Sequence, residues 1–222
     1  LIVKTQLSHI KEELDKKKPA ALIIEIPSNP LLQCVDLISI SQLAKKRNIP
    51  IIVDDTIGSS INVHLTPYAD VVFSSLTKSF AGRGDILAGS TVISPYSNWK
   101  KELTEIIPKV ALSTLSDSDS IELEITSRDV KDRLKKLNRS CLKLKEKLEM
   151  KKEISKVLHP QNCKNFNSLL KEGGGYGCLL SFELRGGIEE SKRVYDSLRV
   201  SKGPSLGTNF TLVCPYVQLA HF

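Results

Sequence analysis

Short apolar runs and helical patterns alternate in the first half of the chain. Residues 21–26 form an apolar run rich in β-branched side chains, which predicts a buried strand. Residues 36–47 place apolar side chains at helical spacing, and a second apolar run at 51–53 follows closely. Further apolar runs at 71–73 and 90–93 predict a third and a fourth strand. A strand, a helix and a strand with short joints are typical of an α/β protein whose parallel sheet carries helices on both faces.

A long amphipathic helix is predicted in the middle of the chain. Its apolar positions recur in alternating steps of four and three residues, at Val130, Leu134, Leu137, Cys141, Leu144 and Leu148. We place this helix at residues 129–153 and interpret it as a link between two domains.

The pattern after this helix is mixed. The apolar runs 154–158 and 178–184 predict strands, glycines 173–175 predict a turn, and residues 188–198 predict a helix. We therefore divide the chain into a partial large domain (1–128), the linking helix (129–153) and a smaller, partial α+β C-terminal domain (154–222).

The composition narrows the function classes. The chain has 222 residues, of which 41% are hydrophobic and 26% are charged, and this is ordinary for a globular protein. Lysine and arginine exceed aspartate and glutamate by 32 to 25, a net charge of +7. Much of the excess lies on the predicted linking helix, so a solvated helix face is favoured over a nucleic-acid interface, with a coiled-coil partner as a third interpretation.

Cysteines, histidines and apolar runs add expectations about the compartment. Five cysteines without a CxxC spacing argue against a disulfide framework, and neither they nor the four histidines show the spacing of metal ligands. No apolar run is long enough for a membrane span, and the first residues do not resemble a signal peptide. We expect a reduced cytoplasmic location, with the nucleus as an alternative.

Chemically useful side chains follow the predicted strands. Ligands of an open α/β sheet bind outside the carboxyl ends of its strands. Asn29 follows the first strand, Asp54 ends the second, and Ser75, Thr77 and Lys78 follow the third. Ser75 and Thr77 are two residues apart, so in an extended stretch their hydroxyls face the same way.

These groups match the needs of one cofactor. Two hydroxyls and the backbone N–H groups near Gly82 and Gly84 would cradle a phosphate. A lysine can form a Schiff base, and a carboxylate such as Asp54 can pair with a protonated ring nitrogen. Phosphate, amine and carboxylate partners together are what pyridoxal 5'-phosphate (PLP) requires.

Several ordered motifs resemble one enzyme family. Residues 21–30, 53–56, 70–78 and 82–89 look like the cysteine/methionine-metabolism family of fold-type I PLP-dependent enzymes, which includes cystathionine γ-synthases, lyases and sulfhydrylases. Residues 55–58, 74–78 and 205–208 resemble its fungal cystathionine γ-synthase-like branch. The resemblance implies the α/β fold of PLP-dependent transferases of fold type I.

The resemblance also implies roles for individual residues. Lys78 corresponds to the lysine that binds the cofactor covalently and later shuttles protons, and Asp54 to the carboxylate that keeps the pyridine ring protonated. Ser75 and Thr77 correspond to the phosphate-binding hydroxyls, and Asn29 to the amide near the phenolic oxygen. Ser205 lies where the family has a serine near the substrate carboxylate. Asn29 and Ser205 also fit simple turn positions beside prolines, so a purely structural role remains open for both.

The implied reaction is a γ-replacement that joins cysteine to an activated homoserine ester to give cystathionine. The implied partners are small amino-acid substrates and further copies of the chain in a homodimer or homotetramer, without nucleic acid or membrane. The family's glycine-rich phosphate loop, stacking aromatic ring and C-terminal arginine have no counterpart in residues 1–222. We therefore expect a fragment truncated at both ends, with an exposed sheet edge and uncovered apolar surface. The alternative is a catalytically inactive or truncated paralogue that acts as a non-enzymatic or interaction module.

Overall fold

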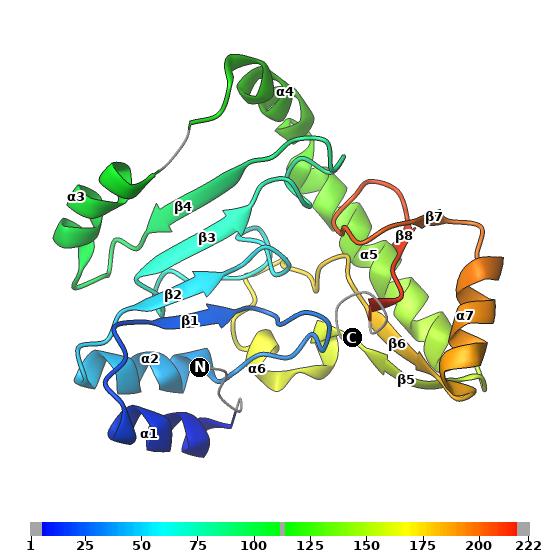
Figure 1. Cartoon of the computed structure of the whole chain (residues 1–222), viewed down its shortest axis with the longest axis horizontal. Coiled ribbons are helices and arrows are strands. Elements are labelled where there is room, and N and C mark those ends of the chain that lie inside the picture. The colour runs from blue at the N-terminus through cyan, green and yellow to red at the C-terminus, as the bar shows by residue number, and fades with distance from the viewer. Residues whose placement is uncertain (1–5, 112–113, 217–222) are drawn as a thin grey trace.

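A four-stranded sheet forms the centre of the first half (Figure 1). The structure is a computed structural model that describes residues 6–111 and 114–216. The strands lie side by side in chain order: β1 (Leu22–Glu25), β2 (Ile51–Asp54), β3 (Val71–Ser75) and β4 (Gly89–Ile93). All four match predicted strands, and β1, β2 and β3 are parallel as expected.

The direction of β4 differs from a purely parallel sheet. β4 pairs with β3 in the antiparallel sense. Residues 76–88 between them form turns and irregular backbone instead of a crossover helix. Because only a crossover connection returns a chain to a parallel neighbour, a connection without a helix leaves β4 antiparallel.

One face of the sheet is covered by helices from both halves of the chain. α2 (Leu37–Lys46) is capped by the Asp36 side chain, which accepts a hydrogen bond from the Ser39 N–H at 3.0 Å. The buried face of α2 packs with Ile51 and Val53 of β2. α1 (Leu7–Lys16) and α6 (Lys164–Asn167) contribute side chains to the same core. Phe166 of α6 is fully buried in this core, so the segment after the linking helix helps to hold the sheet.

Coverage of β1 is incomplete. Successive side chains of a strand point to opposite faces, and Ile23 of β1 is 72% exposed while Leu22 and Ile24 are half-buried. The expectation of helices on both faces is therefore not met at this strand within the described residues, and apolar surface is left open as predicted.

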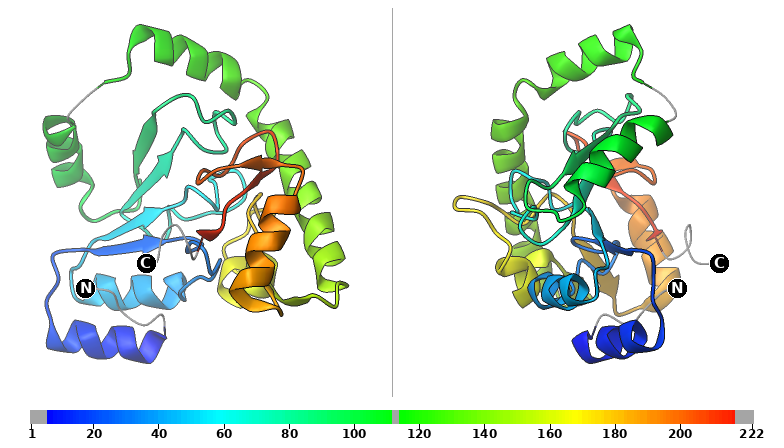
Figure 2. Two further views of the ribbon diagram at one scale, coloured as in Figure 1. Left: turned by 45° about the vertical axis from the view of Figure 1, so that its right-hand side comes forward. Right: turned by 90° about the vertical axis from the view of Figure 1, so that its left-hand side faces the viewer.

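An arch of three helices follows the sheet (Figure 2). It consists of α3 (Lys100–Val110), α4 (Asp117–Ser127) and α5 (Val130–Glu149). α5 is the predicted linking helix, and Leu134 and Cys141 of its stripe are buried. Near the end of the helix, burial departs from the predicted apolar stripe. Lys145 is buried at 8% exposure, whereas Leu144 of the stripe is 44% exposed.

The last part of the chain contains two small sheets. β5 (Ile154–Leu158) pairs antiparallel with β6 (Ser181–Leu184), which is shorter than the predicted strand, and α5 packs on β5. α7 (Gly187–Ser197) matches its prediction, and β7 (Ser201–Lys202) pairs with β8 (Leu212–Val213). The short helix η1 (Pro160–Asn162) precedes α6. Across residues 6–111 and 114–216, no helix has the length and apolar character needed to span a membrane.

Candidate functional site

Lys78 and Ser205 meet although 127 positions separate them. Lys78 lies in the turn after β3, and Ser205 lies between β7 and β8. The Lys78 Nζ donates a hydrogen bond to the Ser205 Oγ at 3.1 Å. Both residues are half-buried, so the amine is held by a hydroxyl while still reachable by a small molecule.

A close backbone approach holds these two loops together. The Asn209 N–H donates to the Gly82 carbonyl at 2.7 Å. Gly207 adopts φ +77°, and a Cβ at this position would lie 2.4 Å from the Ser79 nitrogen. Glycine is required here both by the left-handed backbone and by the missing space. The approach fixes Ser205 beside the lysine.

The adjacent carboxylates Asp54 and Asp55 lie on opposite faces of the sheet. Asp55 is 2% exposed and accepts a hydrogen bond from the Ser74 Oγ, and burial raises the pKa of its carboxyl against the effect of that bond. Asp54 is half-buried and accepts from the Thr56 N–H at 2.9 Å. Asp54 pairs in register with Phe73, so its side chain shares a face with Ser75, two residues further along β3. Asp54 is therefore the more accessible of the two carboxylates.

The expected geometry of Ser75 and Thr77 is wrong in one respect. β3 ends at Ser75, and Thr77 lies in a turn, so the two hydroxyls are not aligned by an extended backbone. The Thr77 Oγ1 accepts a hydrogen bond from the Ala88 N–H at 3.1 Å. Because the Ala88 carbonyl is as far as 3.5 Å away, the hydroxyl proton stays available to a better acceptor.

Four backbone N–H groups of the predicted cradle already have partners. The N–H groups of Ser75, Thr77, Lys78 and Gly82 all donate to atoms of the chain itself. The loop therefore offers hydroxyls, rather than these four N–H groups, to an anion.

Asn29 lies in a loop that the C-terminal part of the chain supports. The Ser28 N–H donates to the Gln33 carbonyl at 3.0 Å, and the Ser181 Oγ donates to the Pro30 carbonyl at 2.9 Å. Asn29 is half-buried, and within the described residues its side chain makes no hydrogen bond. A half-buried amide without a partner is suited to contact a ligand.

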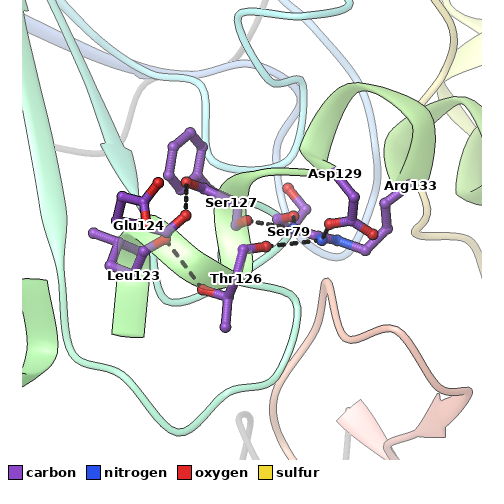
Figure 3. Close-up of polar contacts among 8 residues, drawn as sticks. Ser79, Leu123, Glu124, Thr126, Ser127, Asp129 and Arg133 are labelled. Atoms are coloured by element: carbon purple, nitrogen blue, oxygen red, sulfur yellow. Dashed lines mark hydrogen bonds and ion pairs between the residues drawn. The ribbon is translucent and has the colours of Figure 1, made fainter. Parts of the chain in front are cut away.

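A largely buried arginine on α5, 11% exposed at its side chain, contacts the lysine loop (Figure 3). Arg133 donates to the Thr126 carbonyl at 3.0 Å and to the Phe80 carbonyl, and it forms an ion pair with Asp129. A Cβ at Gly82 would lie 2.7 Å from the Arg133 Nε. The guanidinium thereby joins α5 to the turn that begins at Lys78.

Arg133 and Gly207 were not predicted as parts of the site. Arg133 is one of many basic residues on a lysine-rich helix, and no local pattern separates it from its exposed neighbours. Gly207 lies in a quoted motif, but its contact with Ser79 is a long-range feature that sequence spacing does not contain.

A cavity lies at the amino ends of the strands, opposite the candidate site. It has a volume of about 280 Å³ and is lined by Ile51, Asp70, Tyr96 and Trp99 among others. Ile51 and Val71, next to Asp70, begin their strands, whereas Asp54 and Ser75 end theirs. The cavity is therefore separate from the candidate site.

The residues present fit PLP. The carboxylate of Asp54 lies on the accessible face, and the amine of Lys78 donates a hydrogen bond to one hydroxyl. The Thr77 hydroxyl can donate its proton to an anion. The Asn29 amide adds an unpartnered polar group at the end of a neighbouring strand. These are the donor and acceptor types that a pyridine nitrogen, an aldehyde, a phosphate and a phenolic oxygen require.

Known proteins share this sequence and fold. The chain is 35% identical over 223 residues to cystathionine gamma-synthase of Neurospora crassa, covering 99% of this chain and 36% of that protein. It is 38% identical over 217 residues to cystathionine gamma-synthase of Saccharomyces cerevisiae, covering 91% of this chain and 33% of that one. The chain thus spans about a third of the length of these relatives.

A solved structure and a family profile agree with these relatives. The crystal structure of cystathionine gamma synthase from Xanthomonas oryzae pv. oryzae, in complex with aminoacrylate and cysteine, superposes with a TM-score of 0.85 at 26% identity. The match covers 97% of this chain and 56% of that one, so the fold is that of PLP-dependent enzymes of fold type I. The profile of the Cys/Met metabolism PLP-dependent enzymes matches residues 2–221. With nearly the whole chain matched, this protein belongs to the Cys/Met metabolism family of PLP-dependent enzymes.

Proposed function

We propose that the protein containing this chain is a PLP-dependent trans-sulfuration enzyme. It joins cysteine to an activated homoserine ester by γ-replacement and gives cystathionine. The observation that carries the proposal is the contact between Lys78 Nζ and Ser205 Oγ at the sheet edge that also holds Asp54. The high similarity to two fungal cystathionine gamma-synthases supports the choice of reaction.

Four side chains would hold the cofactor. Asp54 would pair with the ring nitrogen and keep it protonated, and Asn29 would donate to the phenolic oxygen. Ser75 and Thr77 would donate their hydroxyl protons to the phosphate. When bound, PLP supplies an electron sink that stabilises negative charge on the substrate carbons.

Lys78 and Ser205 would act on the substrate. Once its Nζ is neutral, Lys78 is a base that takes a proton from the substrate Cα and then assists removal of a proton from Cβ. The Ser205 Oγ accepts a hydrogen bond from Lys78 and retains its own proton, which it would donate to the substrate carboxylate. One hydroxyl would then orient the base and the substrate together.

Cofactor attachment can be tested directly on the longer protein. Incubation with PLP should give a visible absorption band, and borohydride reduction followed by peptide mapping should find the cofactor on Lys78. Lys78→Ala should abolish the band and the modified peptide, whereas Lys202→Ala, which removes an exposed lysine near the same loop, should retain both. Absence of a specific band would favour the inactive paralogue.

The reaction type needs a separate assay. With cysteine and a homoserine ester, a γ-synthase forms cystathionine, whereas a lyase releases ammonia and a keto acid. We expect cystathionine as the main product by mass spectrometry. Dominant keto acid formation would reject γ-replacement while leaving the cofactor proposal intact.

A further inference from the structure

Two cysteines from distant parts of the chain lie in contact. Cys34 follows the Asn29 loop, and Cys163 immediately precedes α6. The Cys34 N–H donates to the Cys163 Sγ at 3.3 Å, and the Cys163 Sγ lies 3.9 Å from the Cys34 carbonyl oxygen. The Asn165 Nδ2 also donates to that carbonyl at 2.9 Å, which fixes the two segments against each other.

This spacing suits a disulfide bond. The Cys34 Cβ is two covalent bonds from the nitrogen that the Cys163 sulfur touches. Rotation of the Cys34 side chain about its Cα–Cβ bond can therefore bring its sulfur toward the Cys163 sulfur. Both thiols are free in this structure.

The two thiols differ in the way that peroxide chemistry requires. Contact with the Cys34 thiol, together with the Cys34 backbone N–H that donates to the Cys163 sulfur, lowers the pKa of Cys163. Contact with Cys163 and burial raise the pKa of Cys34. Cys163 is half-buried and reachable, while Cys34 is buried at 6% exposure beside it. A reachable thiolate with a resolving thiol next to it is the arrangement of an oxidisable pair.

We propose that Cys34 and Cys163 form a reversible disulfide bond under peroxide stress, which fastens the loop carrying Asn29 to α6. The Cys163 thiolate attacks the O–O bond of hydrogen peroxide, giving a sulfenic acid and hydroxide, which takes up a proton to become water. The Cys34 sulfur then attacks the sulfenic sulfur, the S–S bond forms, and a second water leaves. The two sulfurs lose two electrons, and the peroxide gains them. The chemistry is independent of the proposed trans-sulfuration.

A second pair of cysteines, Cys141 and Cys178, could form a disulfide bond instead. Cys178 contributes to the raised pKa of Cys141, so these two lie near each other as well. Burial raises the pKa of both thiols, which disfavours the thiolate that attacks peroxide. We therefore expect Cys34 and Cys163 to react first.

Mass spectrometry identifies the bond. The protein is treated with equimolar hydrogen peroxide, blocked with an alkylating reagent and digested with trypsin. Wild type should lose two of its five titratable thiols and yield residues 157–164 linked to the peptide containing Cys34, and dithiothreitol should reverse the link. Cys163→Ser and Cys34→Ser should each abolish the linked peptide, and the matched control Cys214→Ser should retain it.

The outcome distinguishes the alternatives. A link between Cys141 and Cys178, or a sulfinic acid at Cys163 with Cys34 still alkylatable, would overturn the proposal. Because Cys34→Ser places a hydroxyl in the core, a folding failure of that variant leaves Cys163→Ser as the decisive substitution. Hydrogen exchange gives an independent readout: oxidation should slow exchange in residues 27–35 by about tenfold, and an unchanged rate would contradict the fastening of this loop.

Discussion

At the scale of single residues, the position of Lys78 depends on a glycine, Gly207, whose lack of a side chain lets two loops meet. Gly207 lies against the backbone of Lys78 and Ser79, and a Cβ there would be 2.9 Å from the Lys78 carbonyl carbon and 2.4 Å from the Ser79 nitrogen. Backbone atoms cannot move aside as a flexible side chain does. The two loops of the proposed site therefore stay together only while this residue is glycine.

Gly207→Ala should consequently lower the melting temperature and weaken cofactor attachment at Lys78. Gly173→Ala is the matched control, because Gly173 has a similar φ of +71° but a Cβ there would meet nothing within 4 Å. The control should show the cost of the left-handed backbone alone, about 1 kcal/mol, and Gly207→Ala about 1–3 kcal/mol more. Thermal denaturation and PLP absorbance measure both effects. Equal losses in the two variants would disprove a specific clash at Gly207.

His159 makes stability depend on pH. It is 2% exposed, its Nδ1 accepts from the Gln161 N–H at 3.3 Å, and its Nε2 is buried without a hydrogen bond in the described structure. Burial, followed by the charge of Lys145, lowers the pKa of this imidazole to about 4. The unfolded chain therefore binds a proton that the folded chain rejects between about pH 6.5 and pH 4. The folded state keeps its full stability above this window and loses up to about 3 kcal/mol as pH falls through it.

His159→Asn should flatten this dependence. Asparagine retains an acceptor for the Gln161 N–H but cannot be protonated, so its melting temperature should fall less than that of wild type between pH 7 and pH 4.5. The variant also loses the ring contact with Tyr176, so it should start from a lower melting temperature at pH 7. His64→Asn changes an exposed histidine and should leave the slope unchanged. A wild-type slope in His159→Asn would show that other groups control the acid sensitivity.

At the scale of elements, α4 and α5 form a frame around the turn that begins at Lys78. Leu123 of α4 packs in a small apolar cluster with Ala81 and Ile86 from the loop after the lysine. Arg133 of α5 donates to the Phe80 carbonyl in the same turn. The helices therefore position the lysine through its loop rather than by direct contact.

Replacing Arg133 tests this frame. Arg133→Met retains an aliphatic stem but leaves the carbonyls of Thr126 and Phe80 without a donor, at a cost of about 2–3 kcal/mol. We expect a lower melting temperature and weaker PLP binding. Arg139→Met changes an exposed arginine of the same helix and should leave both quantities near wild type. A drop in melting temperature with unchanged PLP affinity would show that the arginine stabilises the fold without positioning the lysine.

Elements with a clear hydrophobic period were predictable from the sequence, and those without one were not. The strands β1, β2 and β3 and the helices α2, α5 and α7 match their predicted ranges within a few residues. α3 was not predicted, since it contains Pro108 and buries no residue. The placement of Asp54, Lys78 and Asn29 at strand ends follows from the parallel sheet, whereas the Ser205 contact depends on long-range packing that spacing does not encode.

At the scale of the whole molecule, several large apolar side chains are exposed to solvent on the single chain. Within the arch, α3 and α4 carry four exposed apolar side chains, and β1 exposes Ile23. The four are Ile106, Val110, Ile121 and Ile125. Large apolar side chains that gather on an exposed surface mark sites of association with other proteins. They agree with the relatives being about three times as long and with the homodimer or homotetramer expected from the family resemblance.

The exposed side of α4 provides a test of self-association. Ile121 and Ile125 are 62% and 47% exposed and lie one helical turn apart, whereas Leu123 between them is buried. The double variant Ile121→Lys, Ile125→Lys should weaken association of the 222-residue chain in sedimentation velocity at two concentrations, while its melting temperature changes little because neither side chain contributes to the core. Leu123→Ala should do the reverse, lowering the melting temperature because it removes a buried side chain from the cluster around the lysine loop. If the double variant sediments as wild type does at both concentrations, the arch takes no part in association and the open face of β1 becomes the surface to test.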